Sequence, residues 1–276
     1  MTPELKIAPK TALIAGRGAL PAALARAMAT PPLVAALKGF VPDDLTVDIG
    51  FRVERLGPFL RHLGDHGVER VVFAGAVQRP ALDPALIDPE TATMLPRLMQ
   101  AMAAGDDATL RVVLELFVEA GFAVAGVAEL APGLLPGPGL LAGVVTPQDA
   151  ADAVRAAAIV AALGAVDVGQ GAVVVQGLCL GVEALPGTDA MLTALTGLSP
   201  GLRPDPGQGR GLFYKAPKPG QDMRIDLPTI GPATVQAVAD AGLGGIAFQA
   251  GGVICLDLPE MQRAAEDLGL FLWARG

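Results

Sequence analysis

Short apolar runs alternate with amphipathic segments along the first half of the chain. Runs typical of buried strands occupy residues 11–16 (TALIAG), 45–49 (LTVDI), 70–77 (RVVFAGAV) and 122–127 (FAVAGV). Apolar residues recur at helical spacing between them, at residues 20–28, 55–67 and 106–121. Buried strands that alternate with helices predict an α/β fold with a largely parallel sheet covered on both faces.

The pattern changes after residues 131–139 (APGLLPGPG), which are rich in proline and glycine and resemble a linker. An alanine-rich helix is predicted at 147–164, and apolar strand segments interrupted by glycine follow at 171–185 and 244–258. We place the boundary at residue 135. Residues 1–135 are predicted to form a Rossmann-like N-terminal domain. Residues 136–276 are predicted to form a C-terminal mixed α/β domain that is catalytic and carries the block KAPKPGQDMRID.

The composition of the chain argues against a membrane-spanning, a secreted or a nucleic-acid-binding protein. Hydrophobic residues make up 52% of the chain, but the longest uncharged stretch, 131–148, contains prolines that would break a membrane-spanning helix. The polar N-terminus (MTPELKIAPK) does not resemble a signal peptide, and Cys179 and Cys255 form no CxxC pair, which favours a reduced cytoplasmic setting. The net charge of −8 argues against binding nucleic acid.

Two glycine-containing turns follow predicted strands. GRGALP (16–21) has Gly16 and Gly18 of a dinucleotide-binding fingerprint, but Pro21 replaces its third glycine. The turn can still offer backbone N–H groups to a phosphate, and a purely structural turn explains it equally well. GAVQRP (75–80) follows a strand expected at the centre of the sheet. Its Arg79 is a candidate phosphate ligand or a surface arginine.

Two other patterns have structural explanations. His62 and His66 are spaced to lie on one helix face, as zinc ligands do, but no third ligand is apparent. Thr188 and Asp189 follow a predicted buried strand together with Glu183. Capping of the helix that follows would account for Thr188 and Asp189 without any function.

The densest charge lies in KAPKPGQDMRID (215–226), which carries five charged residues between prolines in a chain that is only 17% charged. If QDMRIDL (221–227) is a strand, then Asp222, Arg224 and Asp226 share one face. Paired carboxylates beside cations suit metal-assisted chemistry on phosphate groups, because Mg²⁺ prefers one or two carboxylates and retains water. The structural alternative is a solvated strand with internal ion pairs.

The chain resembles a known family, the LpxI-type UDP-2,3-diacylglucosamine pyrophosphatases of lipid A biosynthesis. The resemblance extends over nearly the whole length. The segments that carry it are GRGALP (16–21), GAVQRP (75–80), GDDATLR (105–111), GQGAVVVQG (169–177), GTDAML (187–192), KAPKPGQDMRIDLPTIGPATV (215–235) and AGLGGIAFQAG (241–251). The block that begins at Lys215 is the most specific.

The resemblance implies hydrolysis of UDP-2,3-diacylglucosamine to UMP and 2,3-diacylglucosamine 1-phosphate (lipid X), with Mg²⁺ or Mn²⁺ as cofactor. It implies catalytic residues within QDMRID, which leaves Asp222 and Asp226 as alternatives, and metal ligands at Asp222, Asp226 and Asp189. Substrate contacts are expected from the matching segments, at Gly16, Gly18, Leu20, Arg79, Gln170, Thr188, Lys215, Lys218, Gln221 and Arg224.

The expected partners are an acylated sugar nucleotide and the cytoplasmic surface of the inner membrane, where the enzyme would be peripheral. Whether the chain is a monomer or a homo-oligomer is not decided by the sequence. One position departs from the family, which has Glu-Gly-Thr-Asp where this chain has Pro186-Gly187-Thr188-Asp189. Glu183, three residues before Pro186, is a candidate replacement for the missing glutamate.

Two alternative functions remain. An NAD(P)-dependent oxidoreductase would use GRGALP, with Asp48 as the only candidate acidic ligand for the ribose. A non-catalytic sugar-nucleotide- or lipid-binding protein would bind the same substrate without turnover and would not need both Asp222 and Asp226.

Overall fold

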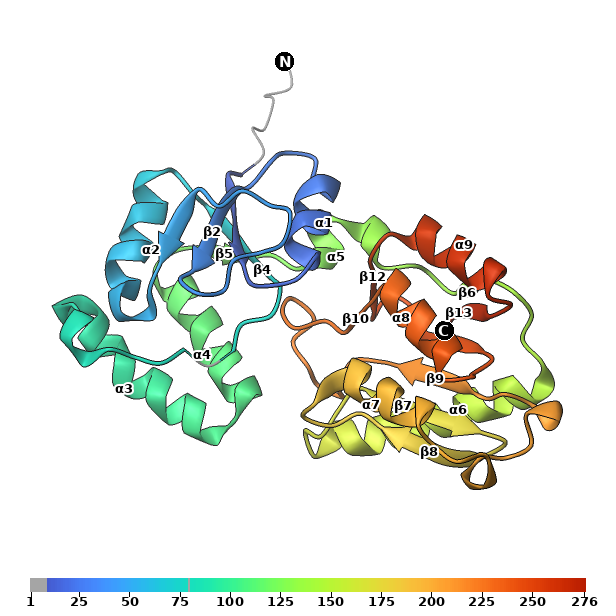
Figure 1. Cartoon of the computed structure of the whole chain (residues 1–276). Helices are drawn as coiled ribbons and strands as arrows, with labels where there is room; N and C mark the ends of the chain where they lie inside the picture. Colours follow the sequence, from blue (N-terminus) through green and yellow to red (C-terminus); the bar gives the residue numbers. More distant parts are fainter. Residues whose placement is uncertain (1–8, 79) are drawn as a thin grey trace, which may run out of the picture. The chain divides into compact units, whose positions relative to one another are not determined.

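Two compact units make up the computed structural model, which describes residues 9–78 and 80–276 (Figure 1). Unit 1 extends to Pro132 and also contains a later segment, Asp222–Asp226. Unit 2 comprises Gly133–Gln221 and Leu227–Gly276. Within the described residues, no helix is both long enough and apolar enough to cross a membrane.

The sheet of unit 1 has five strands in the order β3-β2-β1-β4-β5, and every neighbouring pair is parallel. The strands are β1 (Thr11–Ala15), β2 (Leu33–Leu37), β3 (Ile49–Phe51), β4 (Arg70–Ala74) and β5 (Ala123–Val124). This is the strand order of a doubly wound, Rossmann-like sheet. The prediction of a Rossmann-like parallel sheet is therefore confirmed.

Helices cover both faces of this sheet. They are α1 (Leu20–Ala27), α2 (Leu56–Asp65), α3 (Pro89–Ala104), α4 (Asp106–Glu119) and α5 (Val127–Leu130), with 3₁₀ turns at Val53–Arg55 (η1) and Pro84–Leu86 (η2). Successive strand residues point to opposite faces. Ala12 and Val71 therefore pack with Phe59 of α2 and Phe117 of α4, whereas α1 contacts the neighbouring strands from the other side.

Unit 1 differs from the expectations in three details. The predicted strand at 45–49 is mostly loop, and the second strand is Leu33–Leu37, which two preceding prolines concealed. Asp48 instead accepts a hydrogen bond from the N–H of Val34 at 2.8 Å, so it ties the loop to β2. Helix α3 was not predicted, because it contains Pro96. The segment at 122–127 forms the short strand β5 and leads into α5.

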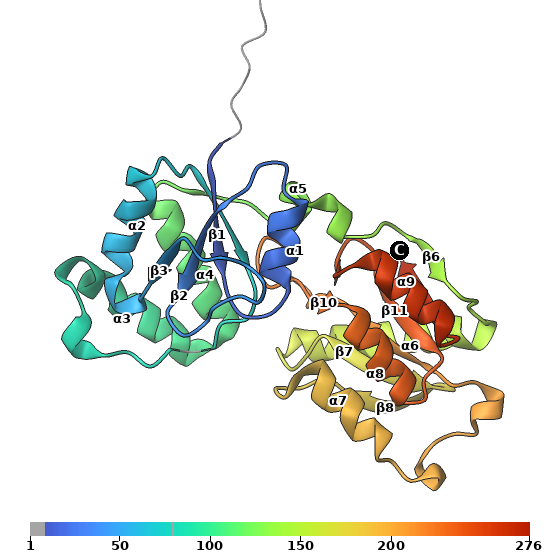
Figure 2. The same cartoon turned by 45° about the horizontal axis from the view of Figure 1, so that its top comes forward.

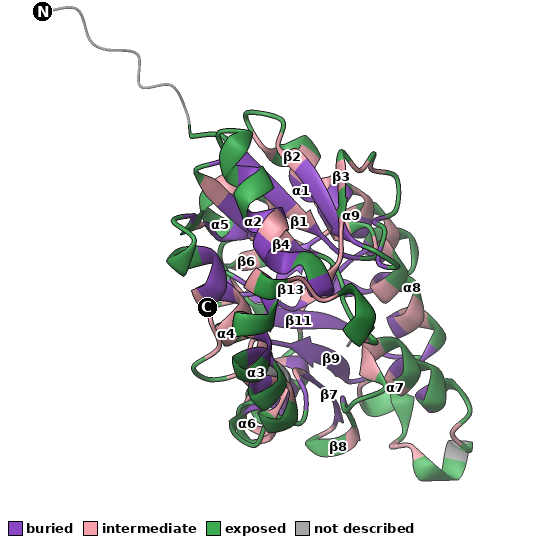
Figure 3. Cartoon of the chain, turned by 90° about the vertical axis from the view of Figure 1, so that its left-hand side faces the viewer, coloured by how far each residue is buried: buried purple, intermediate pink, exposed green. Residues whose placement is uncertain are grey.

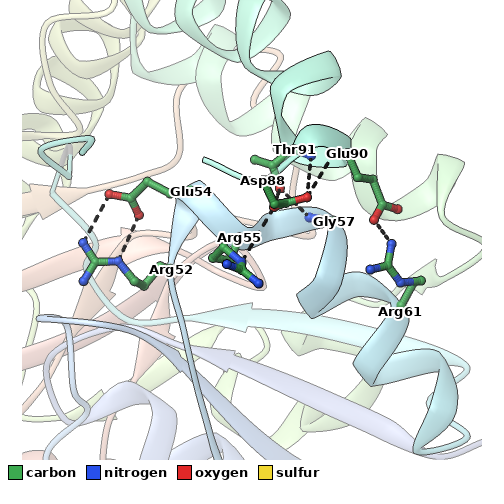
Figure 4. Close-up of polar contacts among 8 residues, drawn as sticks. All are labelled: Arg52, Glu54, Arg55, Gly57, Arg61, Asp88, Glu90 and Thr91. Atoms are coloured by element: carbon green, nitrogen blue, oxygen red, sulfur yellow. Dashed lines mark hydrogen bonds and ion pairs between the residues drawn. The ribbon is translucent and has the colours of Figure 1, made fainter. Parts of the chain in front are cut away.

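Buried polar contacts anchor the start of α3 to the start of α2 (Figure 4). Asp88 caps α3 by accepting hydrogen bonds from the backbone of Glu90 at 3.0 Å and Thr91 at 3.2 Å. The Thr91 hydroxyl accepts a hydrogen bond from the N–H of Gly57 at 2.9 Å. These bonds satisfy N–H groups that a helix leaves without partners at its first turn.

Unit 2 contains a six-stranded mixed sheet in the order β6-β13-β11-β9-β7-β8, whose inner strands are buried in Figure 3. Its strands are β6 (Gly139–Ala142), β7 (Gly171–Val175), β8 (Leu178–Val182), β9 (Leu212–Lys215), β11 (Gly245–Gln249) and β13 (Phe271–Arg275). Strands β9, β11 and β13 are parallel, and β6, β7 and β8 are antiparallel to their neighbours. A separate pair joins β10 (Thr229–Ile230) to β12 (Ile254–Cys255). The predicted mixed α/β fold is confirmed.

The helices of unit 2 also lie on both faces of its sheet (Figure 2). They are α6 (Pro147–Ala165), α7 (Gly187–Thr196), α8 (Pro232–Asp240) and α9 (Leu258–Asp267), with 3₁₀ turns at Pro132–Leu134, Pro200–Leu202 and Pro206–Gln208. Ala172 and Val174 of β7 pack with α6. Val173 and Val175 point the other way and pack in the cluster formed with α7, α8 and α9.

The apolar run at 171–185 is a hairpin of two strands, β7 and β8. Its turn residues Gln176 and Gly177 both have positive φ, at 50° and 78°, as the tight turns of hairpins require. Fully buried Asp152 of α6 accepts hydrogen bonds from both turn N–H groups, at 2.8 and 2.7 Å. Helix α6 therefore holds this hairpin turn directly.

Candidate active site

The two glycine-containing turns meet at the carboxyl edge of the sheet in unit 1. GRGALP follows β1 and GAVQRP follows β4, and these two strands are neighbours. The strand order reverses here, because β2 leads away from β1 on one side and β4 lies on the other. Open α/β sheets bind ligands in the crevice at such a point.

The approach of these turns requires glycine on both sides. A Cβ on Gly16 would lie 2.6 Å from the Ala76 carbonyl oxygen, and a Cβ on Gly75 would lie 2.7 Å from the carbonyl carbon of Gly16. Gly18 has a φ of 92°, and Leu20 begins α1 immediately after it. Gly16, Gly18 and Leu20 thus shape the turn at the switch point. Arg79 lies outside the described residues.

The segment Asp222–Asp226 belongs to unit 1, although the sequence on both sides of it belongs to unit 2. The prediction that 221–227 forms a strand was wrong: the segment is a turn, closed by a hydrogen bond from the Ile225 N–H to the Asp222 carbonyl at 3.1 Å. The Asp222 carboxylate also accepts a bond from the Arg224 N–H at 3.0 Å, a contact typical of aspartate in turns. In the same unit, the Cα of Arg224 would lie 3.1 Å from a Cβ on Gly126, which follows β5.

Asp222 and Arg224 form an ion pair instead of lying in a row along a strand. Nη2 of Arg224 lies 2.6 Å from one carboxylate oxygen, and Nε lies 3.0 Å from the other. The Arg224 guanidinium lowers the pKa of Asp222, against the opposing effect of partial burial, and the positive charge of Arg111 lowers it further. Asp222 is therefore a carboxylate held in its ionised form, mainly by its contacts with Arg224.

Asp226 ends the turn with a left-handed backbone, at a φ of 61°. Aspartate adopts this conformation more readily than most residues, but it is uncommon and often occurs at functional positions. The flanking residues Ile225 and Leu227 are buried, whereas Asp226 and Met223 are exposed. The buried side chains anchor the turn and leave both aspartates at its surface side.

Lys215 takes part in a different cluster, within unit 2. Its ammonium group lies 2.5 Å from a carboxylate oxygen of Glu183 and 2.7 Å from the hydroxyl of Thr188. The Thr188 hydroxyl donates to the same Glu183 oxygen at 2.7 Å. Lys215 is only 5% exposed and Glu183 9%. Glu183, the candidate for the glutamate missing before Gly187, therefore binds both predicted ligands Thr188 and Lys215.

The remaining predicted residues of unit 2 lie near one another along the 167–170 and 218–221 loops. The Gln170 side chain donates to the Gln221 side chain at 2.8 Å, and the Lys218 N–H donates to the same Gln221 oxygen at 2.9 Å. The Lys218 ammonium pairs with Asp167 at 2.5 Å. Asp189 is exposed in the first turn of α7. Gln170, Lys218 and Gln221 therefore form one hydrogen-bonded group.

No group of three histidine, cysteine, aspartate or glutamate side chains that could hold a metal occurs in the part of the chain that the structure describes. The His62 and His66 rings contact each other, with their centroids 4.3 Å apart, but no third ligand joins them there. Asp189 belongs to unit 2, whereas Asp222 and Asp226 belong to unit 1. Within unit 1, a metal held at the 222–226 turn would have Asp222 and Asp226 as its predicted ligands.

A cavity of about 620 Å³ opens between α2, α3 and α4. Apolar residues such as Leu60, Met94 and Phe122 line it, and the ion pair of Arg61 with Glu90, seen in Figure 4, lies at its wall. None of the residues predicted from the sequence lines this cavity. It is therefore separate from the turns at the switch point.

Two contributors to the site were not singled out as site residues from the sequence. The positive charge of Arg111, on α4, lowers the pKa of Asp222. Gly126 packs closely against the backbone of Arg224. Arg111 closes the GDDATLR motif, so the sequence contained a signal for it. Gly126 had no such signal, because its importance comes from a segment almost a hundred residues later in the chain.

Comparison with known proteins matches nearly the whole chain. The model of the LpxI N-terminal domain matches residues 10–134, and that of the LpxI C-terminal domain matches residues 138–273. The UDP-2,3-diacylglucosamine pyrophosphatase LpxI of Caulobacter vibrioides is 40% identical over 271 residues, which cover 95% of this chain and 96% of the relative. The resemblance seen in the sequence motifs is confirmed.

Proposed function

This chain belongs to the LpxI family, and from that membership we propose that it hydrolyses the pyrophosphate of UDP-2,3-diacylglucosamine in lipid A biosynthesis. The products would be UMP and 2,3-diacylglucosamine 1-phosphate (lipid X). The observation that carries the proposal is the consecutive match of both family domains, together with a relative that is named for this activity and is matched over 96% of its length.

The geometry of unit 1 supports chemistry on a phosphate group. The two glycine turns approach each other closely, so their backbone lies at the crevice of the switch point. Phosphates of nucleotide ligands commonly bind there. The Asp222–Asp226 turn joins the same unit and packs against Gly126, two residues after the end of β5. Arg224 and Arg111 can offset negative charge that develops on phosphate oxygens as the bond breaks.

Mg²⁺ or Mn²⁺ fits the donor chemistry of this turn. Asp222 and Asp226 supply hard oxygen ligands in a five-residue turn, and Mg²⁺ is commonly held by one or two carboxylates with substrate phosphates and water. When bound, the ion would stabilise the charge that develops on the pyrophosphate oxygens. Asp222 would have to exchange part of its contact with Arg224 to serve as a ligand, so we propose that Arg224 moves toward the phosphate.

The test is release of UMP by the purified chain incubated with UDP-2,3-diacylglucosamine and Mg²⁺. We expect turnover that EDTA abolishes and that added Mg²⁺ or Mn²⁺ restores. Asp222→Asn or Asp226→Asn should lower kcat by about a hundredfold or more, as the removal of a group that acts in the transition state does. Asp240→Asn, on the surface of α8, is the matched control and should leave kcat unchanged.

Two results would count against the proposal. If both variants at 222 and 226 turn over like the parent chain, the catalytic turn is misplaced. If the parent chain binds UDP-2,3-diacylglucosamine but releases no UMP with any divalent metal, a non-catalytic binding protein is the better explanation. The two aspartates can be ranked by comparing the metal concentration at which each variant regains activity.

The oxidoreductase alternative is less well supported. The residue that follows β2 is Lys38, at the position where a dinucleotide-binding fold has an acidic ligand for the ribose. Asp48 is occupied in holding the β2 backbone. The absence of any change in nicotinamide absorbance on mixing the protein with NAD(P)H and candidate substrates would exclude this alternative.

We further propose that the chain meets its substrate at the cytoplasmic surface of the inner membrane, because two acyl chains hold such a substrate in a bilayer. Each buried CH₂ group contributes about 0.8 kcal/mol, so extraction into water is strongly unfavourable. Turnover of substrate embedded in vesicles, at a rate that depends on its surface density, supports this. A rate that depends only on dissolved monomeric substrate would exclude it.

A further inference from the structure

A cation lies inside the glycine turn at the switch point of unit 1. Arg17 stands between Gly16 and Gly18, in the turn that follows β1. Its backbone pairs with Ala76 of the neighbouring turn, through hydrogen bonds of 2.9 and 3.0 Å. This pairing fixes the start of the Arg17 side chain at the carboxyl edge of the sheet, beside the ends of β1 and β4.

Two contacts with residues just after β2 hold the Arg17 guanidinium. Its Nη2 donates a hydrogen bond to the Gly39 carbonyl at 2.7 Å. Its central carbon lies 5.0 Å from the centroid of the Phe40 ring, within the range of a cation–π contact. Phe40 is buried, whereas Arg17 is exposed. The guanidinium is therefore oriented by the protein and still open to solvent.

Most of the hydrogen-bonding capacity of this guanidinium is unused. A guanidinium has five N–H donors, and it pairs best with a carboxylate or phosphate that accepts two of them side by side. Among the described residues, the Gly39 carbonyl is the one acceptor of the Arg17 side chain, and no carboxylate pairs with it. Arg52, which follows β3 at the same edge, differs because it pairs with Glu54 at 3.3 Å. The charge of Arg17 therefore remains available to a ligand.

The surroundings of Arg17 favour a phosphate as that ligand. No atom of the described residues lies within 4 Å of the position that a Cβ on Gly18 would take, so the space beside the turn is open. Lys38, directly after β2, is a second exposed cation at this edge. Asp43 approaches the turn with its backbone, whose N–H donates to the Gly18 carbonyl at 3.4 Å. Ribose hydroxyls would call for a carboxylate after β2, whereas phosphates bind at glycine turns of this kind.

We propose that Arg17 is a substrate-binding residue that holds a phosphate of the nucleotide pyrophosphate at the switch point. The inference rests on the hydrolysis proposed above and adds a residue to its site. Two N–H groups of the guanidinium would donate to two oxygens of one phosphate. The Phe40 ring and the Gly39 carbonyl already hold the guanidinium, so less conformational entropy is lost on binding than with a free side chain.

The first test is the binding of UDP in EDTA, where the proposed metal cannot contribute, measured by titration calorimetry. We expect Arg17→Gln to raise the dissociation constant by about tenfold or more, because hydrogen bonds between two charged groups are lost. Arg17→Lys should raise it less, since lysine keeps the charge but not the planar pair of donors. Arg26→Gln, the same change at an exposed position late in α1, is the matched control and should leave the dissociation constant unchanged.

Uridine, which lacks a phosphate, separates binding from a structural role of Arg17. We expect its affinity, measured by saturation-transfer NMR, and the unfolding midpoint of the chain to be the same for the parent chain and Arg17→Gln. An equal loss of affinity for UDP and uridine, or a lowered unfolding midpoint, would assign Arg17 to the structure of the turn and overturn the inference. A parent chain that binds UDP no more tightly than uridine would also overturn it.

Release of UMP from UDP-2,3-diacylglucosamine separates this inference from the proposed function. We expect Arg17→Gln to lower kcat/KM by about tenfold or more. If the variant binds UDP and releases UMP like the parent chain, the inference about Arg17 fails and the proposed hydrolysis stands. If the parent chain binds UDP through Arg17 but releases no UMP, the hydrolysis fails and Arg17 remains a phosphate-binding residue.

Discussion

At the scale of single residues, the charged side chains of the most specific block have two different roles. Asp222 and Arg224 pair with each other at the surface of unit 1, where an ion pair adds little stability and its charges remain available. Lys215 is buried with Glu183 and Thr188. A buried pair depends strongly on both partners, because removal of one leaves an uncompensated charge. The role of Lys215 is therefore at least partly structural.

We expect Lys215→Met to lower the free energy of unfolding by about 3–5 kcal/mol, because Glu183 would remain buried without its cation. Adding Glu183→Gln to that variant should recover a large part of the loss, since no buried charge then remains. Urea denaturation measures both. Arg263→Met provides the control, because the Arg263–Glu260 pair is exposed and should be worth no more than about 0.5 kcal/mol. A double variant no more stable than Lys215→Met would contradict this account.

At the scale of helices and strands, apolar periodicity predicted elements where local pattern decides the structure. Helices α2, α4 and α6 agree with it, because their apolar residues recur at helical spacing. Strand β2 was not predicted, since two prolines directly precede it. Helix α3 was not predicted, since it contains Pro96. In both, tertiary packing overrides a local signal against regular structure.

Some parts of the candidate site could be predicted from the sequence and others could not, again because local pattern does not determine tertiary packing. The glycine turns follow strands in the sequence, so their position at one sheet edge could be inferred from the α/β pattern. The 222–226 turn could not, because its shape depends on the ion pair of Arg224 with Asp222 and on the burial of Ile225. A run of alternating polar and apolar residues is equally compatible with a strand.

Hydrogen bonds from neighbouring elements to Glu54 make the free energy of unfolding depend on pH. Glu54 of η1 is 3% exposed. Burial opposes its ionisation, but hydrogen bonds from the Asp83 N–H and from Arg52 outweigh burial and lower the pKa of Glu54. A carboxylate with a lowered pKa stabilises the fold above its unfolded-state pKa of about 4.3. That contribution is lost as the pH falls through the folded-state value.

Glu54→Gln should therefore destabilise the chain by about 1–3 kcal/mol at neutral pH, since the buried donors lose their charged acceptor. The difference from the parent chain should shrink as the pH falls below about 4, where the parent glutamate is itself protonated. Urea denaturation across this range measures the difference. Glu69→Gln, an exposed position before β4, provides the baseline. A difference that stays constant with pH would mean that Glu54 stabilises through its shape alone.

At the scale of the whole molecule, the chain passes between its two units three times, after Pro132, after Gln221 and after Asp226. The second and third passages place the aspartate turn in a unit that is otherwise built from the first part of the sequence. Within that turn Ile225 is buried, and one isoleucine contributes about 1.5–3 kcal/mol. Such a contribution corresponds to a dissociation constant no tighter than the millimolar range.

A contribution of this size is effective within one continuous chain, since a short linker gives an effective concentration in the millimolar range. We therefore expect that cleavage at a protease site inserted after Leu135 will abolish UMP release at micromolar protein. Both fragments should stay folded and separate on gel filtration, because the turn then has to bind unit 1 from solution. The same protease site inserted after Gly207, an exposed position in unit 2, is the matched control and should leave activity intact. Full activity of the chain cut after Leu135 at micromolar concentration would mean that contacts stronger than the burial of Ile225 hold the turn in unit 1.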